Sequence, residues 1–540
     1  MSYTSRSTSI TDLPGEVLAQ ISDHLHPTTL AALFRAIPAF APVCPSRRFE
    51  WRDEQQNTIL HLLAKQGAVM LMDSLPMRAV EAARDVSNKY GQTPLSVAAE
   101  FGHRAVVEWL LERALVDVES RDYYGLTPLA QAARFGREAV VSILLVNSRV
   151  DVNSRDNNGA TPLTHAASGD CSAVASMSRE RIGTRTKARS DNGALHLPRA
   201  TKSNYASVVK LILARDDVDA DCTDNKGRTP LSRAAENGQE EIVNILLARD
   251  DVEADSKDHT GATPLMFAAL CGNEVILRLL LGRDDVDVAS EDDDGETALS
   301  WACKEAALKV LLERDDVDVN EKDGNGWTPL ARAVLDRHEA LVRLLLDEYN
   351  ADAESRDNEG KTPLALAAEY LTEAMATLLL ERSDVDVNSR DADGCTPLML
   401  VAMLRKKEVR KLSELTNASE SEHADESMAR LLLARCDVEA DAKNRLGCTP
   451  LSAAAAMGKE AMVRLLLERN DVEADSKDRF GRTPLSVAAE AGKDVVVTLL
   501  LERNDVDVNS TDADGYTPLM RAMQSSRPAV VKLLLAKKDK

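Results

Sequence analysis

The 540-residue chain has few aromatic residues, no long apolar run and no paired cysteines. Aromatic residues make up only 4% of the sequence, so the core has to be built from Leu, Val and Ala. The eight cysteines are scattered without a C-x-x-C pair, which argues against a disulfide framework or a zinc site. No run approaches the ~18 apolar residues of a membrane span, and residues 1–10 lack the apolar stretch of a signal peptide. We therefore expect a soluble protein of the cytoplasm or nucleus, with a disordered segment at 1–10.

Basic residues are also fewer than acidic residues. The chain has 66 Lys and Arg against 88 Asp and Glu, a formal net charge of −22. Such a charge argues against nucleic acids and anionic membranes as partners. Much of the acid lies in a recurring loop, for example Arg-Asp-Asp-Val-Glu at 249–253. This loop is either a solvated edge that keeps the protein soluble or an acidic ridge that recruits a basic partner.

Motifs for catalysis are missing too. The sequence contains no H-E-x-x-H motif, no nucleophile elbow and no cluster of His, Cys and carboxylates. Gly360-Lys361-Thr362 is similar to the end of a phosphate-binding loop, but Ser355 stands where that loop needs its first glycine. We therefore expect no enzymatic activity, no cofactor and no metal, and look for a binding function.

What the chain contains in abundance is one unit, best seen at 478–505. A D-x-x-G turn leads to Thr483 and Pro484, which suit the N-cap and the first position of a helix. A short helix is predicted at 485–489, and Gly492 is placed to end it. A second predicted helix carries Val495, Val496, Leu499, Leu500 and Leu501. Helices this short are not stable alone in water, so the unit must bury its apolar side against copies of itself.

Copies of this unit occur along most of the chain, usually 34 residues apart. The counterparts of Thr483 are Thr58, Thr93, Thr127, Thr161, Thr229, Thr263, Thr297, Thr328, Thr362, Thr396, Thr449 and Thr517. The pattern D-x-x-G-x-T-P-L-x-x-A-A-x-x-G resembles the ankyrin repeat. The resemblance implies an all-α solenoid of helix-turn-helix repeats with short β-turn fingers over residues 51–540. One departure recurs: the ankyrin loop G-A-D-V-N is replaced by a longer Arg-Asp-Asp-Val-Asp, as at 215–219.

Three intervals depart from the period. Thr297 and Thr328 are 31 residues apart, which predicts a shortened turn after Cys303. Residues 404–427 are an insert rich in Ser, Glu and Lys, which we interpret as a loop or an extended helix end. The gap from Thr161 to Thr229 is twice the period, and 191–197 retain D-N-G-A-L-H-L. We interpret 169–207 as a decayed repeat, with an insert as the alternative, so the array has 13–14 repeats.

The segment 11–50 differs from the repeats. Its apolar residues fall on two short amphipathic helical faces that cannot bury their own surface. The segment resembles an F-box, which begins with Leu-Pro and continues with Glu-hydrophobic-Leu. The resemblance implies binding of the Skp-type adaptor of a cullin-based ubiquitin ligase through Leu13, Pro14, Val17, Leu18, Ile21, Leu25, Leu30 and Leu33. The alternative is a helical cap that shields the end of the solenoid.

A candidate surface for a second partner is found in two early repeats. Ankyrin partners usually meet the turn tips and the exposed positions of the first helices. At these places most units carry small or charged residues, whereas two adjacent units carry Tyr90, Phe101, Tyr123, Tyr124, Leu126, Arg134 and Phe135. Exposed aromatic residues and Arg dominate binding hot spots. The alternative is that these rings pack against neighbouring turns.

Together these features predict a monomeric protein that binds other proteins. In the leading hypothesis it is the substrate receptor of a cullin-type ubiquitin ligase: the F-box-like segment binds the adaptor, and the repeats bind an unknown protein substrate. The alternative is an interaction scaffold whose N-terminal helices only cap the solenoid.

Overall fold

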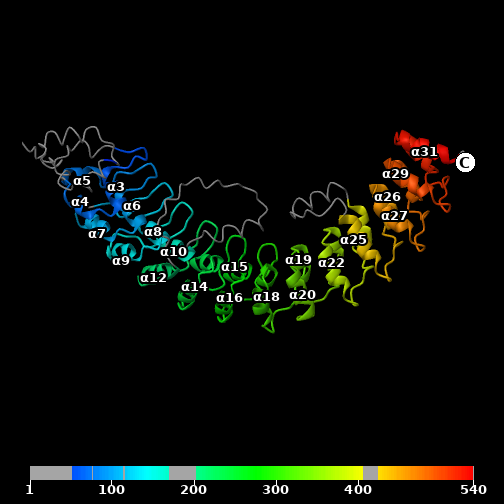
Figure 1. Cartoon of the computed structure of the whole chain (residues 1–540). Coiled ribbons are helices and arrows are strands. Elements are labelled where there is room, and N and C mark those ends of the chain that lie inside the picture. Colours follow the sequence, from blue (N-terminus) through cyan, green and yellow to red (C-terminus); the bar gives the residue numbers. More distant parts are fainter. Residues whose placement is uncertain are drawn as a thin grey trace, which may run out of the picture. The chain divides into compact units, whose positions relative to one another are not determined.

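The computed structural model describes Thr29 and residues 52–75, 77–113, 116–169, 202–404 and 424–538. Apart from Thr29, the F-box-like segment 11–50 lies outside these residues. Over the described ranges every regular element is a helix, and the helices form thirteen successive pairs. The predicted all-α repeat architecture is therefore confirmed. The chain divides into two compact units, Met1–Asp293 and Asp294–Lys540, here called the N-terminal and C-terminal units. Within each unit successive helix pairs stack side by side (Figure 1).

Six helix pairs belong to the N-terminal unit. Their first helices are α3 (Ile59–Gln66), α6 (Pro94–Phe101), α8 (Pro128–Arg134), α10 (Pro162–Ser168), α13 (Pro230–Glu236) and α15 (Pro264–Cys271). The second helices are α4 (Val69–Asp73) followed by α5 (Met77–Ala83), α7 (Arg104–Arg113), α9 (Glu138–Val146), α12 (Lys202–Leu213), α14 (Glu240–Leu247) and α16 (Glu274–Leu281). The first pair is irregular, because two short helices, α4 and α5, take the place of one second helix.

Seven pairs belong to the C-terminal unit. Their first helices are α17 (Ala298–Trp301), α19 (Pro329–Leu335), α21 (Pro363–Glu369), α23 (Pro397–Met403), α26 (Pro450–Met457), α28 (Pro484–Ala491) and α30 (Pro518–Gln524). The second helices are α18 (Glu305–Leu312), α20 (Glu339–Asp347), α22 (Glu373–Leu380), α25 (Ala424–Leu433), α27 (Glu460–Leu467), α29 (Asp494–Leu501) and α31 (Pro528–Lys538).

Each helix pair is specified by a few local contacts, as the repeat at 478–505 illustrates. The Oδ1 atom of Asp478 accepts hydrogen bonds from the backbone N–H groups of Phe480 and Arg482, at 2.9 and 2.8 Å, and so fixes the turn. Thr483 caps α28: its Oγ1 accepts a hydrogen bond of 3.2 Å from the N–H of Ser486. Gly492 ends α28 at φ 72°, in the left-handed conformation predicted for it.

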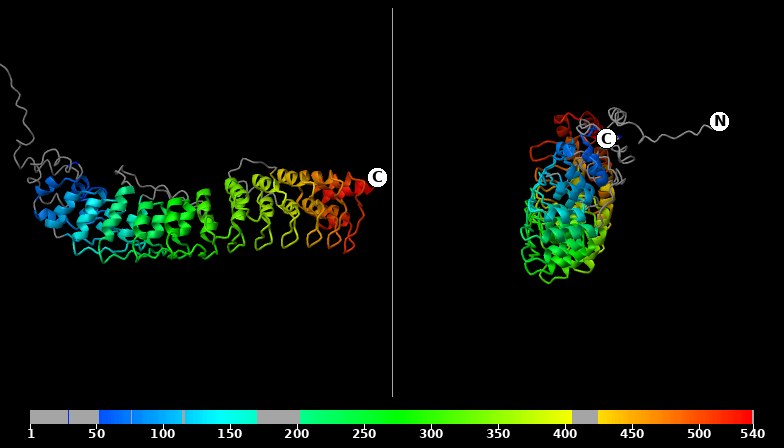
Figure 2. Two further views of the ribbon diagram at one scale, coloured as in Figure 1. Left: turned by 90° about the horizontal axis from the view of Figure 1, so that it is seen from below. Right: turned by 90° about the vertical axis from the view of Figure 1, so that its left-hand side faces the viewer.

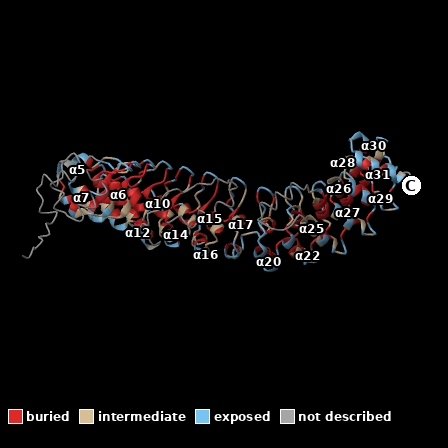
Figure 3. Ribbon diagram, turned by 45° about the horizontal axis from the view of Figure 1, so that its top comes forward, coloured by how far each residue is buried: buried red, intermediate tan, exposed pale blue. Residues whose placement is uncertain are grey.

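The core runs between the stacked pairs. In α28 and α29 the side chains of Leu485, Val497 and Leu500 have no exposed surface. Burying one such side chain contributes roughly 1.5–3 kcal/mol, which the isolated pair could not gain. Figure 3 shows the consequence: buried residues follow the helix faces between neighbouring repeats, and exposed residues follow the turns.

Neighbouring repeats are also joined by hydrogen bonds between their turns, which project as fingers from one side of the helices (Figure 2). The N–H of Ala513 donates to the carbonyl of Phe480 on the preceding finger, at 2.8 Å. The N-cap threonines add a second contact, since the Thr362 hydroxyl lies 2.9 Å from that of Ser389 in the next repeat. Each finger is thus fixed by the finger before it.

The interpretation of 169–207 as a decayed repeat is wrong. Helix α10 packs directly against α13, and α12 packs against α10, α9 and α14. The Tyr205 hydroxyl of α12 donates to the Arg134 carbonyl at 3.2 Å, just as Arg137 at the start of α9 donates to the Glu100 carbonyl. Helices α10 and α12 are therefore the two halves of one repeat, and residues 170–201 are an insert between them. The doubled interval from Thr161 to Thr229 therefore reflects residues added between these two helices.

The other two irregular intervals differ in where the length of the repeat changes. Helices α23 and α25 form one pair, with residues 405–423 between them, and α25 already begins at Ala424. The prediction that the 31-residue interval shortens the turn after Cys303 is wrong. The interval shortens the helix instead, because α17 ends at Trp301 after four residues. The two long intervals thus add residues between the first and second helix of a repeat, whereas the short interval removes residues from the end of a first helix.

Candidate partner-binding surface

Three of the predicted surface residues, all tyrosines, lie on two adjacent fingers of the N-terminal unit. The side chains of Tyr90, Tyr123 and Tyr124 are 44%, 71% and 59% exposed. The N–H of Tyr123 donates to the Tyr90 carbonyl at 3.0 Å. The Tyr123 ring lies across Gly91, where an added Cβ would be 2.7 Å from Cδ1 of the ring. These contacts join the backbones of the two fingers and place the Tyr123 ring beside the finger of Tyr90. The three exposed residues Tyr90, Tyr123 and Tyr124 are here called the tyrosine surface.

The backbone under this surface is held from the other side as well. Asn157 on the next finger donates from its backbone N–H to the Tyr124 carbonyl at 3.0 Å, and from Nδ2 to the Tyr123 carbonyl at 2.9 Å. Asp122 Oδ1 accepts a hydrogen bond of 2.8 Å from the Tyr124 N–H. The rings are therefore exposed on a rigid backbone, so a partner would not have to order a flexible loop on binding.

Leu126 does not belong to the surface, contrary to the prediction, because its side chain is only 1% exposed. It follows the turn glycine. Apolar residues at the same place in other repeats, Ala262 and Cys395, are buried as well. In these three repeats the side chain that follows the turn glycine is directed into the repeat.

Phe101, Arg134 and Phe135 lie at the other end of the first helices, away from the fingers. Phe101 is the last residue of α6, and Phe135 directly follows α8. An eight-residue helix such as α6 is about 12 Å long, so these side chains are separate from the tyrosine surface. Both rings are half-buried: Lys65 lies 5.3 Å from the Phe101 ring centre, and Arg134 lies 5.8 Å from that of Phe135. The seven predicted residues therefore form two groups, with Leu126 in neither.

Comparison with known protein families settles what kind of repeat this is. A model described as ankyrin repeats (3 copies) matches residues 31–122, 114–180, 197–292, 284–357, 305–391, 375–478, 415–512 and 469–540. The chain belongs to the ankyrin-repeat family. Ankyrin repeats are protein-binding modules, typically without enzymatic activity, and the predicted role in protein–protein interaction is confirmed at this level. A search of curated proteins found no match.

Outside the tyrosine surface, the ankyrin fingers carry one apolar pair that the sequence prediction missed. Leu446 and Phe480 are 52% and 54% exposed, and the Arg479 N–H joins their fingers by donating to the Leu446 carbonyl. The pair does not appear as a cluster of aromatic residues in the sequence, because the neighbour of Phe480 is a leucine. The position of Leu446 directly before the turn glycine was the signal that could have identified it.

The longer loop that distinguishes these ankyrin repeats from the usual pattern has a structural role. Arg249 pairs with Asp251 through two hydrogen bonds, of 2.7 and 2.6 Å, and donates to the Leu213 carbonyl of the preceding repeat at 3.2 Å. The hydrogen bond from Arg249 lowers the pKa of the Asp251 carboxyl. The neighbouring Asp250 is exposed. Part of the acid of this loop therefore connects one repeat to the next, and part of it is solvated.

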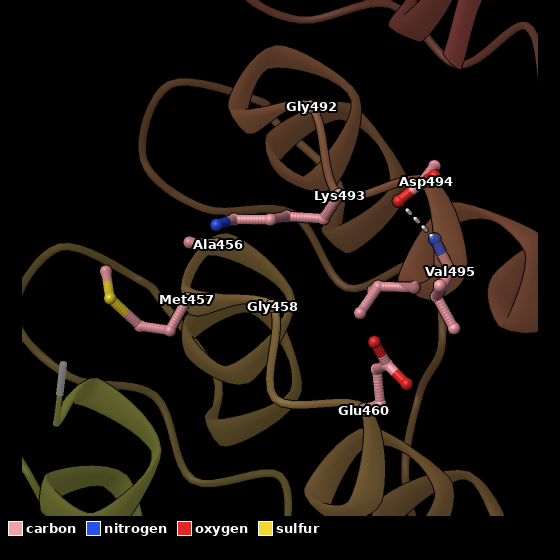
Figure 4. Close-up of a pocket in the computed structure, with 9 residues that line it drawn as sticks. Ala456, Met457, Gly458, Glu460, Gly492, Lys493, Asp494 and Val495 are labelled. Atoms are coloured by element: carbon pink, nitrogen blue, oxygen red, sulfur yellow. Dashed lines mark hydrogen bonds between the residues drawn. The ribbon is translucent and has the colours of Figure 1, made fainter. Parts of the chain in front are cut away.

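The C-terminal unit also has a hollow of about 460 Å³ between the turns of two adjacent ankyrin repeats (Figure 4). Lys493 extends over it toward Ala456, and Met457 and Glu460 line it. Asp494, on its rim, accepts a hydrogen bond from the Val495 N–H at 3.1 Å. No group of His, Cys, Asp and Glu among the described residues could hold a metal ion. No described helix is long and apolar enough to span a bilayer.

Proposed function

We propose that the tyrosine surface is the main binding site of this ankyrin array for its protein partner. The observation that carries the proposal is the exposure of Tyr90, Tyr123 and Tyr124 on two fingers that are hydrogen-bonded to each other. Exposed aromatic clusters are uncommon on soluble proteins and are typical of binding hot spots. The partner covers the rings and accepts hydrogen bonds from their hydroxyl groups.

The charge of the finger tips favours a neutral or acidic segment of the partner. Five successive fingers of the N-terminal unit carry no carboxylate between their turn Asp or Asn and the turn glycine, in a protein with a net charge of −22. Their tip residues are Lys89, Tyr90, Tyr123, Tyr124, Asn157, Asn158, Asn225, Lys226, His259 and Thr260. An acidic segment along this row meets two lysines and no like charge.

The experiment compares the proteins captured by the full chain with those captured by Tyr123→Ala/Tyr124→Ala. A buried aromatic anchor contributes roughly 2 kcal/mol or more, so each loss lowers affinity about thirtyfold or more. The matched control is Phe480→Ala, which removes a ring of similar exposure from a finger of the C-terminal unit. Loss of the same partners in both variants, or in neither, would assign binding to another surface.

We further propose that the segment 11–50 makes the protein a substrate receptor of a cullin-type ubiquitin ligase. The support is the resemblance to an F-box, carried by Leu13-Pro14 and the apolar positions that follow it. The first ankyrin match begins at residue 31, inside this segment, which keeps the capping role as the second candidate. Leu18→Asp/Ile21→Asp should abolish binding of a purified Skp-type adaptor, whereas Ser5→Asp/Ser7→Asp carries the same charge change and should retain it. Failure of the unmodified chain to bind the adaptor would leave only the capping role.

A further inference from the structure

One position of the ankyrin loop connects a repeat to the next in most of the array, and Asn153 and Asn388 fill it with two hydrogen bonds each. Asn153, three residues before the turn Asp156, accepts a hydrogen bond through Oδ1 from the Asp219 N–H at 2.9 Å, and donates from Nδ2 to the Asp217 carbonyl at 2.7 Å. Asn388 makes the same two bonds to Glu439 and Asp437, both at 2.7 Å. The amide side chain thus satisfies one donor and one acceptor of the next repeat. We call this place the loop clamp position.

Aspartate occupies the loop clamp position in five repeats. Asp85 accepts from the Asp117 N–H through Oδ1, and its Oδ2 accepts from Arg84. The other four, Asp221, Asp255, Asp441 and Asp475, differ from it. One carboxylate oxygen keeps the acceptor role: Oδ2 of Asp221 accepts from the Glu253 N–H at 2.8 Å, and Oδ2 of Asp475 accepts from the Asp507 N–H. Asp255 and Asp441 accept from the backbone of Asp287 and Glu473 in the same way. The other oxygen, Oδ1 in all four, is buried without a hydrogen-bond partner.

This second oxygen stands where asparagine carries its NH₂ group. In Asn153 and Asn388 that group donates to a backbone carbonyl two residues before the N–H that the side-chain oxygen accepts. An ionised carboxylate has no hydrogen to donate, so its Oδ1 atom cannot bond to a backbone carbonyl oxygen, which is also an acceptor. A buried acceptor without a donor is unfavourable. A protonated carboxyl group, in contrast, has the same donor and acceptor as the amide.

We propose that the four aspartates take up protons in mild acid, and that protonation completes the hydrogen bonds that asparagine makes, so that acid tightens the coupling between repeats. The proton is bound at Oδ1, which then donates to the backbone carbonyl of the next repeat, while Oδ2 keeps its bond from the N–H. Asp221 and Asp255 act within the N-terminal unit, and Asp441 and Asp475 within the C-terminal unit.

The surroundings favour the protonated form. Burial is the main cause that raises the pKa of all four carboxyls, that of Asp255 to about 6. The charged groups that face them are Glu253, Asp219 and Asp251 at Asp221; Asp287, Lys257 and Asp285 at Asp255; Glu473, Lys443 and Asp471 at Asp441; Asp507, Asp505 and Glu473 at Asp475. Most of these are carboxylates, which repel a further negative charge, and only Lys257 and Lys443 act in the opposite direction.

The direction of the pH effect follows. In the folded chain each pKa lies above that of an unfolded aspartate, about 3.9. The stabilisation is therefore complete below about pH 4 and is lost as the pH rises through the folded pKa, which is about 6 for Asp255. His61 acts with the opposite sign, because its burial lowers its pKa to about 4. His61 is the same in every variant below, so its contribution cancels in the comparison.

The test replaces the four residues together by Asp221→Asn, Asp255→Asn, Asp441→Asn and Asp475→Asn in the full chain. The variant should have a higher urea midpoint than the wild type at about pH 7.5, and the difference should shrink toward about pH 5. At the Asp255 site alone, the folding equilibrium constant changes up to about tenfold between these pH values, an upper bound because solvent screens the half-buried group. The matched control replaces the exposed Asp216, Asp250, Asp284 and Asp315 by Asn. It carries the same charge change and should keep the wild-type dependence on pH.

The reverse change gives a second, independent measurement. Asn153→Asp/Asn388→Asp should lower the urea midpoint at about pH 7.5 and restore most of it at about pH 5, since the new carboxyls then bind protons. The proposal is overturned if the fourfold Asn variant and its exposed control respond to pH alike. A midpoint of the Asn153→Asp/Asn388→Asp variant that is lowered equally at both pH values would overturn it as well.

Discussion

Arg283 offers the sharpest test of how the longer loop stabilises this ankyrin array. Its Nε and Nη2 atoms donate to the two carboxylate oxygens of Asp285 at 2.8 and 2.7 Å, and Nη1 donates to the Leu247 carbonyl at 3.0 Å. Leu247 is the last residue of α14 in the preceding repeat. Arg283 therefore satisfies a carbonyl at the negative end of a helix, and the Asp285 carboxylate holds the guanidinium in place.

The contribution of Arg283 to the free energy of unfolding can be divided between its contacts with Asp285 and with the Leu247 carbonyl. The Arg283–Asp285 pair has side chains 25% and 48% exposed, and such ion pairs contribute about 0–1 kcal/mol. A hydrogen bond from a charged donor to the half-shielded Leu247 carbonyl contributes about 1.5 kcal/mol or more. Arg283→Met keeps much of the apolar stem of the side chain and removes both interactions, so it should cost about 2 kcal/mol. Asp285→Asn, which leaves the carbonyl contact in place, should cost less than about 1 kcal/mol.

The assay is urea unfolding of Arg283→Met, Asp285→Asn and the double variant, followed by circular dichroism. If Asp285 acts only through Arg283, the double variant should be no less stable than Arg283→Met alone, because the two side chains form one unit. The reasoning fails if Asp285→Asn costs as much as Arg283→Met. Strictly additive losses would contradict it too, because they would give Asp285 a role independent of the arginine.

Two further predictions concern single residues. Gly91 and Gly515 share a left-handed backbone, with φ of 79° and 80°, but an added Cβ would lie 2.7 Å from Tyr123 at Gly91 and would contact nothing at Gly515. Gly91→Ala should therefore lower the melting temperature more than Gly515→Ala. Equal losses would show that the contact with Tyr123 is unimportant. His61 binds the Thr58 N–H through Nδ1 at 3.1 Å and contacts the Gln92 carbonyl through Nε2 at 2.9 Å, and burial lowers its pKa to about 4. Stability from His61 is complete above about pH 6.5 and is lost as the pH falls toward its folded pKa, so the difference in urea midpoint between wild type and His61→Gln should shrink over that range.

Local sequence signals specified the repeat almost to the residue. Thr483 and Pro484 start α28 and Gly492 ends it, because capping and backbone freedom depend on single side chains. The exposure of the three tyrosines could also be predicted, since the turn tip faces solvent in every finger. These features depend on a few neighbouring residues and need no knowledge of distant contacts.

Features that depend on the next repeat could not be predicted in this way. The bond from Arg283 to the Leu247 carbonyl joins residues 36 apart, and the sequence shows only a charged loop. Leu126 follows the same turn as the exposed tyrosines, but its side chain turns into the repeat. The interpretation of 169–207 as a repeat rests on the doubled interval from Thr161 to Thr229 and on the D-N-G-A-L-H-L motif. Neither shows which helices pack against each other.

The assignment of α10 and α12 to one repeat can be tested at Tyr205. Its side chain is 5% exposed, and its hydroxyl donates to the Arg134 carbonyl at the end of α8. Tyr205→Ala empties a buried site and should cost roughly 3–5 kcal/mol, whereas Tyr205→Phe removes only the hydrogen bond and should cost about 1 kcal/mol.

The matched control for Tyr205 is Tyr124→Ala, because Tyr124 lies nearby in the array but is 59% exposed. This control should change the urea midpoint little, since its ring has almost no packing to lose. A helix outside the stack would tolerate the loss of Tyr205 equally well. Equal midpoints for Tyr205→Ala and Tyr124→Ala would therefore show that α12 does not pack into the stack, and would overturn its assignment to the repeat of α10.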